Sequence, residues 1–319
     1  MAYGGGPTQI QPAAIPFATR LRARFRPRAI YKREEMLMGY LFILVPLVIF
    51  FTFNFGGMIF DFWISFHRWA ILDTPVFNGS RNYNYLFNVD PVWWTAVKNT
   101  IKYALLVVPI QTAVAFTLAL IVNQNIKGKK FFRTTFYFPS VTSSVAISLL
   151  FLYLFNNFGL VNYALGKVQI GGPNWLGDPA TALYSIMGLN IWTTTGTLMI
   201  IFLAALQDVP REVLEAAAID GATGSRAVIS IVLPLIRPAL FFVIANGLIG
   251  CLQIFDQAFV LSQGSGGPEN ATMTAVLYIY NTAFQSSLYG VAAAASFVLF
   301  AFIFVATLVV RQLLGEEAS

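Results

Sequence analysis

The sequence predicts an all-α membrane protein with six transmembrane helices. Of its 319 residues, 57% are hydrophobic and only 11% are charged, whereas soluble domains carry about 25% charged residues. The hydrophobic residues gather in long blocks, and the charges lie mostly between the blocks. Strands of an outer-membrane barrel would instead alternate in polarity over about ten residues. These observations exclude a soluble enzyme, a disordered chain and an outer-membrane barrel.

The rarer residue types exclude further kinds of site. The single cysteine, Cys251, cannot form an internal disulfide or a cysteine cluster, and the single histidine, His67, excludes a histidine metal site. We therefore expect no metal. The net charge of +6 could suggest nucleic acid, but seven of the twenty basic residues lie between Arg20 and Arg33, directly before a hydrophobic block. Basic residues there are typical of the cytoplasmic flank of a membrane helix, so we expect no nucleic-acid partner and a lipid bilayer instead.

Hydrophobic blocks near the roughly 20 residues needed to cross a bilayer recur six times. The expected spans are 36–60, 103–126, 134–155, 179–207, 238–255 and 288–310. The expected organisation is a cytoplasmic tail with a basic segment at 1–35, the first span and an exterior loop at 36–97, a five-helix core at 98–311 with a long connection at 207–237, and a cytoplasmic tail at 312–319.

The charges between the spans predict the orientation. The N-terminal segment, the second and fourth connections and the C-terminal tail together hold 15 of the 20 basic residues. Because basic residues accumulate on the cytoplasmic side, both termini are expected in the cytoplasm. An even number of spans agrees with this orientation.

The connection between the fourth and fifth spans is unlike the others. Pro210, with Glu212 in the first turn after it, is a helix-start signal, and the sequence up to Ile219 favours a helix. Gly221 and Gly224 then interrupt it. A second short helix is expected from about 225 to 232, where Pro234 should stop it. The pattern predicts two short helices joined by a glycine turn, with alanines that could fit a groove on a partner.

This connection resembles the EAA motif of bacterial ATP-binding-cassette importer permeases. Glu215-Ala216-Ala217 is followed after three residues by Gly221, and after nine more by Ile231-x-Leu233-Pro234. The resemblance implies a type I importer permease fold and a coupling helix that docks into a cleft of an ATPase subunit. The residues it assigns to this coupling are Glu212, Glu215, Ala216, Ala217, Asp220, Gly221, Leu233 and Pro234.

Shorter matches to the maltose and glycerol-3-phosphate type of permease follow in order along the chain. They are Asn99-Thr100, Phe136-Tyr137-Phe138-Pro139, Gly159-Leu160-Val161-Asn162, Asn174-Trp175-Leu176, Phe255-Asp256 and Gly266-Gly267-Pro268. The resemblance implies a multi-pass protein of the bacterial cytoplasmic (inner) membrane that moves a sugar, a di- or oligosaccharide, into the cytoplasm. The implied partners are a second homologous permease, an ATPase dimer that binds ATP and Mg²⁺, and an extracytoplasmic solute-binding protein.

No catalytic residues are expected in this chain. It contains no Gly-x4-Gly-Lys-Ser/Thr loop for phosphates, no His-Glu-x-x-His and no Gly-x-Ser-x-Gly. It should therefore hold no cofactor and not be an enzyme. The alternatives are the same importer class carrying glycerol-3-phosphate or another small polar solute, a self-sufficient secondary transporter, and a membrane enzyme. A secondary transporter would favour inverted repeats and buried ionisable groups, which the sequence does not display.

Uncharged polar residues within two spans are the candidates for binding a sugar, because a sugar offers hydroxyls for hydrogen bonds and flat faces for stacking. The fourth span supplies Asn190, Trp192, Thr193, Thr194 and Thr197, and the fifth supplies Asn246, Gly247, Gly250 and Gln253. The glycines should leave room for a sugar ring. Packing between helices through small residues is the alternative role for the threonines and glycines.

Overall fold

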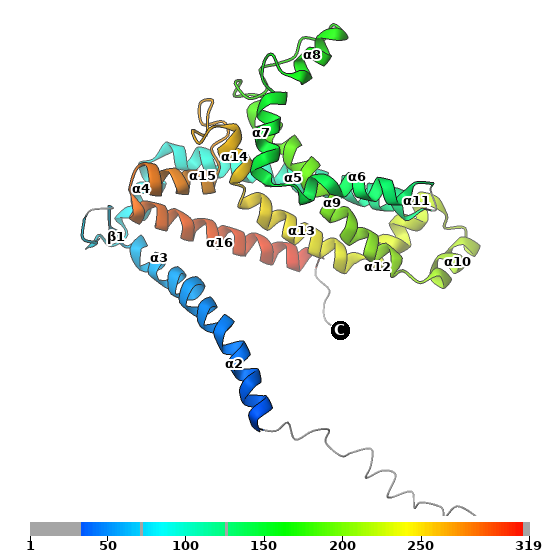
Figure 1. The fold of residues 1–319 in the computed structure, drawn as a ribbon, viewed down its shortest axis with the longest axis horizontal. Helices are drawn as coiled ribbons and strands as arrows, with labels where there is room; N and C mark the ends of the chain where they lie inside the picture. Colours follow the sequence, from blue (N-terminus) through cyan, green and yellow to red (C-terminus); the bar gives the residue numbers. More distant parts are fainter. Residues whose placement is uncertain (1–32, 71–72, 125–126, 315–319) are drawn as a thin grey trace, which may run out of the picture. The chain divides into compact units, whose positions relative to one another are not determined.

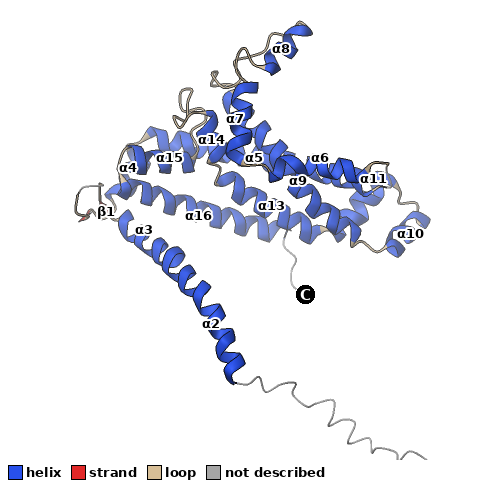
Figure 2. Cartoon of the chain, viewed as in Figure 1, coloured by secondary structure: helices blue, strands red, loops and turns tan. Residues whose placement is uncertain are grey.

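The structure is a computed structural model that describes residues 33–70, 73–124 and 127–314. It divides into two compact units, Met1–Ile59 and Phe60–Ser319, which are described separately. Helices account for about three quarters of the described chain (Figure 2). Among the described residues, five helices are long and apolar enough to cross a membrane, or six if one sharply bent pair counts as a span. The predicted helical membrane fold is confirmed at this level.

The first unit holds α2 (Arg33–Ile49) and a π-helical segment, η1 (Phe50–Gly56), which leads into α3 (Gly57–Ser65). Together they form a spanning helix from Met36 to Ser65, five residues longer than the predicted first span. The basic segment up to residue 32 lies outside the described residues.

The second unit begins within α3 and continues with a two-stranded antiparallel hairpin, β1 (His67–Arg68) and β2 (Val76–Phe77), followed by α4 (Arg81–Asn88). Asn82 holds the hairpin, because its amide donates to the carbonyl oxygens of Ser65 (2.8 Å) and His67 (2.9 Å).

Helix α5 (Pro91–Asn123) starts twelve residues before the predicted second span. Asp90 caps it by accepting from the backbone nitrogen of Val92, and Pro91 occupies the first turn. The other carboxylate oxygen of Asp90 accepts from the hydroxyl of Tyr278 at 2.7 Å. Burial, with the adjacent Asp90 carboxylate, raises the pKa of Tyr278 well above its ordinary value, so the hydroxyl remains a donor.

The predicted third span is wrong as a single helix. Helices α6 (Lys129–Val141) and α7 (Ser144–Leu154) meet at 96° across Thr142 and Ser143. Ser143 caps α7 with its side chain, which allows a new helix to start in a new direction. Helix α8 (Leu160–Lys167) lies in the connection that follows (Figure 1).

The central helices of this unit are α9 (Ala182–Gln207), α13 (Arg237–Leu252) and α16 (Tyr289–Leu314). Helix α9 packs extensively on α5, and α13 packs on α5, α9 and α16. Helix α13 is followed by a break and then by α14 (Asp256–Leu261), while α15 (Ala275–Tyr280) and the π-helical η3 (Asn281–Gln285) precede α16. The core is a layer of buried apolar side chains between α5, α9 and α13.

Candidate functional site

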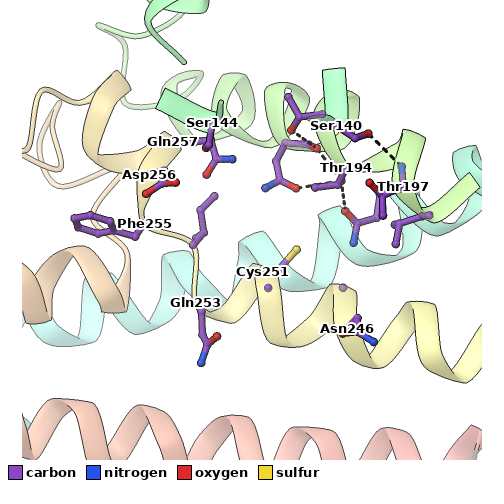
Figure 3. A pocket seen from close by; sticks show the side chains of 17 residues that line it. Ser140, Ser144, Thr194, Thr197, Asn246, Cys251, Gln253, Phe255, Asp256 and Gln257 are labelled. Atoms are coloured by element: carbon purple, nitrogen blue, oxygen red, sulfur yellow. Dashed lines mark hydrogen bonds between the residues drawn. The ribbon is translucent and has the colours of Figure 1, made fainter. Parts of the chain in front are cut away.

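A cavity of about 450 Å³ lies where α5, α9 and α13 meet the α6–α7 bend and the start of α14 (Figure 3). Most of its lining residues are uncharged polar residues or glycines. The lining residues are Gln111, Ser140, Ser144, Asn190, Thr193, Thr194, Thr197, Leu198, Asn246, Gly247, Gly250, Cys251, Gln253, Ile254, Phe255, Asp256 and Gln257. We call it the central cavity.

Gln111 joins the three helices around this cavity. Its side chain is only 2% exposed, and its Oε1 accepts from the hydroxyl of Thr194 on α9 at 2.8 Å. Its Nε2 lies against Gly247 on α13, where an added Cβ would stand 2.6 Å away. Gly247 was expected to leave room for a sugar ring, but the Gln111 amide occupies that space. A Cβ at Gly250, by contrast, would meet no described atom within 4 Å, so Gly250 does leave open space.

The threonines of α9 divide between the cavity and helix packing. The Thr193 hydroxyl donates to a backbone carbonyl one turn earlier. The single Thr194 hydroxyl proton lies within reach of two acceptors, Gln111 Oε1 and the Asn190 carbonyl, so acceptor lone pairs are what both threonines keep for a ligand. Thr195 is buried and bonds its own helix in the same way. Next to it, a Cβ on Gly196 would overlap the backbone oxygen of Phe136 and the Ser140 hydroxyl. Packing through small residues therefore accounts for this part of α9.

Close packing at Gly196 also brings α6 into the cavity wall. The Ser140 hydroxyl oxygen accepts from the backbone nitrogen of Thr197 at 3.1 Å. Ser144, the first residue of α7, follows after the bend. Both serines line the cavity, and neither was predicted.

The break between α13 and α14 supplies the remaining wall. Gln253 is the C-cap residue of α13 and is exposed. The Ile254 carbonyl accepts from the Thr274 hydroxyl at 3.0 Å. The chain then presents Asp256 and Gln257 to the cavity. Asp256 is the one ionisable carboxyl group among the described lining residues, and no basic residue is among them.

The long connection after α9 forms α10 (Arg211–Ile219), beginning directly after Pro210 as predicted. Gly221 and Gly224 both have positive φ angles, +79° and +55°, which glycine adopts without strain. The second helix differs from the prediction, because α11 (Gly224–Ala227), η2 (Val228–Val232) and α12 (Leu233–Leu235) continue past Pro234. Pro234 follows directly on the π-helical η2, near the end of this continuous helical stretch.

The predicted coupling residues are mostly on the surface of this connection. Glu212, Glu215, Ala216, Asp220 and Gly221 are exposed, as is Pro234. Ala217 is the exception, since it is only 6% exposed and its carbonyl accepts from the backbone nitrogen of Ala222. Ala217 therefore packs the turn from inside and does not belong to an exposed alanine face. Leu233 is half-buried.

Residues 111–314 match the family model described as "Binding-protein-dependent transport system inner membrane component". The match includes both the central cavity and the connection around α10. The chain belongs to this family.

Several curated permeases are similar to the chain along most of their length. The probable ABC transporter permease protein YesP of Bacillus subtilis is 33% identical over 279 residues, covering 87% of this chain and 90% of that protein. The trehalose/maltose transport system permease protein MalF of Thermococcus litoralis is 31% identical over 280 residues, covering 87% and 94%. The lactose transport system permease protein LacF of Rhizobium radiobacter is 39% identical over 212 residues, covering 66% and 71%.

A solved structure has the same fold. A chain of a bacterial ABC transporter involved in the import of the acidic polysaccharide alginate aligns with a TM-score of 0.77 at 24% identity, covering 94% of this chain and all of that chain. The type I importer fold implied by the EAA-like motif is thereby confirmed.

One predicted pocket residue of the permease lies elsewhere. Trp192 lines a separate, apolar cavity of about 610 Å³ with Phe138, Ile191 and other side chains of α5, α6 and α9. Its ring lies 5.5 Å from that of Phe151. Consecutive residues on a helix point about 100° apart, so the Trp192 side chain points in a different direction from those of Thr193 and Thr194. The other eight candidates all line the central cavity.

Proposed function

We propose that this permease forms the translocation path of an ATP-driven importer for a neutral sugar, a di- or oligosaccharide. The observation that carries the proposal is the central cavity, whose lining combines carboxamides, hydroxyls and open space at Gly250. Such groups suit the hydroxyls of a sugar. Relatives named for lactose, for trehalose and maltose, and for arabinooligosaccharides support the same substrate class.

A phosphorylated or acidic substrate fits the cavity less well. Phosphate and carboxylate groups are normally held by basic side chains, and the described lining residues include none. Asp256 would also repel an anion. This argues against the alternative of glycerol-3-phosphate.

The complete importer in proteoliposomes is expected to take up neutral oligosaccharides and to exclude glycerol-3-phosphate. Uptake of radiolabelled maltose, lactose, arabinobiose and glycerol-3-phosphate would be compared with and without ATP inside the vesicles. ATP-dependent uptake of glycerol-3-phosphate alone would contradict the proposal.

The partners in this proposal are a second homologous permease, an ATPase dimer that binds ATP and Mg²⁺, and an extracytoplasmic solute-binding protein. Asn246 and Gln253 are exposed polar side chains on a spanning helix. Polar groups facing hydrocarbon are costly, so a second permease covering the cavity would remove this cost. The chain itself offers no phosphate-binding loop, so ATP hydrolysis is assigned to the separate subunit.

The coupling role is assigned to the connection around α10. Glu212, Glu215 and Asp220 are exposed carboxylates on one short helix and its end, and they would pair with basic residues of an ATPase cleft. Ala216 allows close approach, while Ala217, Leu233 and Pro234 hold the connection in shape.

Six spans with both termini in the cytoplasm is the topology that accompanies this function. A reporter that works only outside the cytoplasm should give a signal when fused after Gly172, and none when fused after Gly128 or Gly224. Each fusion point lies in a connection between spans, so the truncated chains keep whole spans. The reverse pattern of signals would overturn the orientation.

A further inference from the structure

A second polar cavity, of about 510 Å³, lies beside the far ends of α7 and α14. Its described lining residues include no charged side chain, and several are carboxamides or hydroxyls. The lining residues are Leu152, Tyr153, Phe155, Asn156, Asn157, Asn174, Leu176, Gly177, Leu261, Ser262, Gln263, Ser265, Gly267 and Pro268. We call it the second cavity.

Helices α7 and α14 pack on each other and connect the two cavities. The central cavity contacts their first residues, Ser144 and Asp256, and the second cavity contacts their last turns, at Leu152 and Leu261. At 1.5 Å per helical residue, the two sets of lining residues are separated by about 6 to 12 Å along these helices. One extended ligand could therefore reach both.

Hydrogen-bonding groups in the second cavity remain available for a ligand. Among the described residues, the side-chain amides of Asn157 and Gln263 make no hydrogen bond. Tyr153, on the last turn of α7, is 77% exposed and offers a flat face and a hydroxyl beside them. Carboxamides with a neighbouring aromatic ring are a favourable combination for a saccharide unit.

The wall around Asn157 and Asn174 is fixed by Asn162. The amide of Asn162 donates to the carbonyl oxygens of Asn157 (3.1 Å) and Pro173 (3.2 Å), and its oxygen accepts from the indole nitrogen of Trp175 (2.7 Å). Asn174 is held in turn, since its side-chain oxygen accepts from the backbone nitrogen of Gly177.

The opposite wall is fixed to helices. Asn281 donates to the carbonyl of Gly264 at 2.9 Å, and Asn99 on α5 donates to the carbonyls of Asn270 and Met273 at 2.9 and 3.0 Å. Two walls held by side-chain hydrogen bonds form a preorganised site, which lowers the entropic cost of binding.

We infer that the second cavity is an additional saccharide subsite, which holds the remaining units of an oligosaccharide whose first units occupy the central cavity. The inference rests on the proposed sugar import. It follows that substrate length decides which subsites are used. A disaccharide fits the central cavity alone, whereas a longer oligosaccharide contacts both cavities.

The test uses the complete importer in proteoliposomes and two probe pairs, maltose with maltohexaose and arabinobiose with arabinohexaose. Asn157→Ala should raise the half-saturation concentration for the longer sugar by about fivefold, the value of one net hydrogen bond, and leave the shorter sugar unchanged. Adding Tyr153→Ala should enlarge the difference. Asn88→Ala is the matched control, because Asn88 is an exposed asparagine on α4 outside both cavities.

The dependence of uptake on sugar length distinguishes a saccharide subsite from a protein-docking surface. If the variants leave the half-saturation concentration of the longer sugar unchanged, as they do for the shorter sugar, the subsite is overturned while sugar import stays intact. A loss for both lengths, together with weaker stimulation of ATP hydrolysis by the loaded binding protein, would make the surface a protein-docking site and overturn the inference. If the unaltered importer takes up neither pair, the proposed function fails and the subsite fails with it.

Discussion

A permease carrying Gly221→Asp is expected to fold and reach the membrane, yet to lose nearly all coupled uptake. Gly221 has a φ of +79°, and an added Cβ would meet no described atom within 4 Å. Aspartate tolerates this left-handed conformation better than most residues, so the turn itself should survive. The new carboxylate would then project toward the ATPase. An unpaired charge buried in an interface costs about 3–5 kcal/mol, which corresponds to docking weakened by at least about a hundredfold.

Gly79→Asp is the matched control for this change. Gly79 has a φ of +59° and equally open surroundings, but it lies by the hairpin, at the other end of the second unit from α10 (Figure 1). Both variants would be measured for membrane content, binding of the purified ATPase and sugar uptake. Retained ATPase binding and uptake in Gly221→Asp would contradict the coupling assignment, and equal losses in both variants would indicate a folding defect.

Gly247→Ala should raise the half-saturation concentration for sugar by about tenfold with little change in membrane content. The added methyl group would meet the Gln111 amide, which stands 2.6 Å from the Cβ position. Gln111 would have to move and would lose its hydrogen bond with Thr194. A buried polar group left without its partner costs about 1–3 kcal/mol, enough for about a tenfold effect.

Shortening Gln111 provides the rescue experiment. Gln111→Asn removes one methylene group and so makes space for the methyl group of Gly247→Ala. The double variant should therefore take up sugar better than Gly247→Ala alone, a coupling that a double-mutant cycle measures. Strictly additive effects of the two substitutions would show that Gln111 and Gly247 do not share this space.

The sequence predicts the spans well where the helix has the same bounds as its hydrophobic block, as it nearly does for α9, α13 and α16. Helix α5 begins earlier than its block, because Lys98 and Lys102 interrupt the apolar run without interrupting the helix. The signal that marks its true start, Asp90-Pro91, is a capping signal rather than a hydrophobic one. The bend between α6 and α7 was missed for a related reason. Thr142 and Ser143 are uncharged, so the block continues through a position where the backbone turns.

The candidate site could be predicted only within the two spans where polar residues cluster. Gln111 lies beside Thr112 in an otherwise apolar stretch of α5, and nothing local distinguishes it from a polar group that packs against a neighbouring helix. Its role depends on Thr194 and Gly247, which lie on two other helices. Trp192 was misplaced because the sequence specifies the composition of α9 but not which of its faces meets α13 and which meets α6.

Arg237 links the start of α13 to the end of α16. The guanidinium of this first residue of α13 donates to the carbonyl oxygens of Leu313 and Leu314 in the final turn of α16, at 3.3 and 3.2 Å. These carbonyls have no partners within their own helix. A movement of the connection before Arg237 would therefore be passed to both α13 and α16, which also pack on each other. A movement driven by the ATPase would reach α13 and α16 together. Helix α16 would then keep α13, which forms part of the wall of the central cavity, from bending on its own.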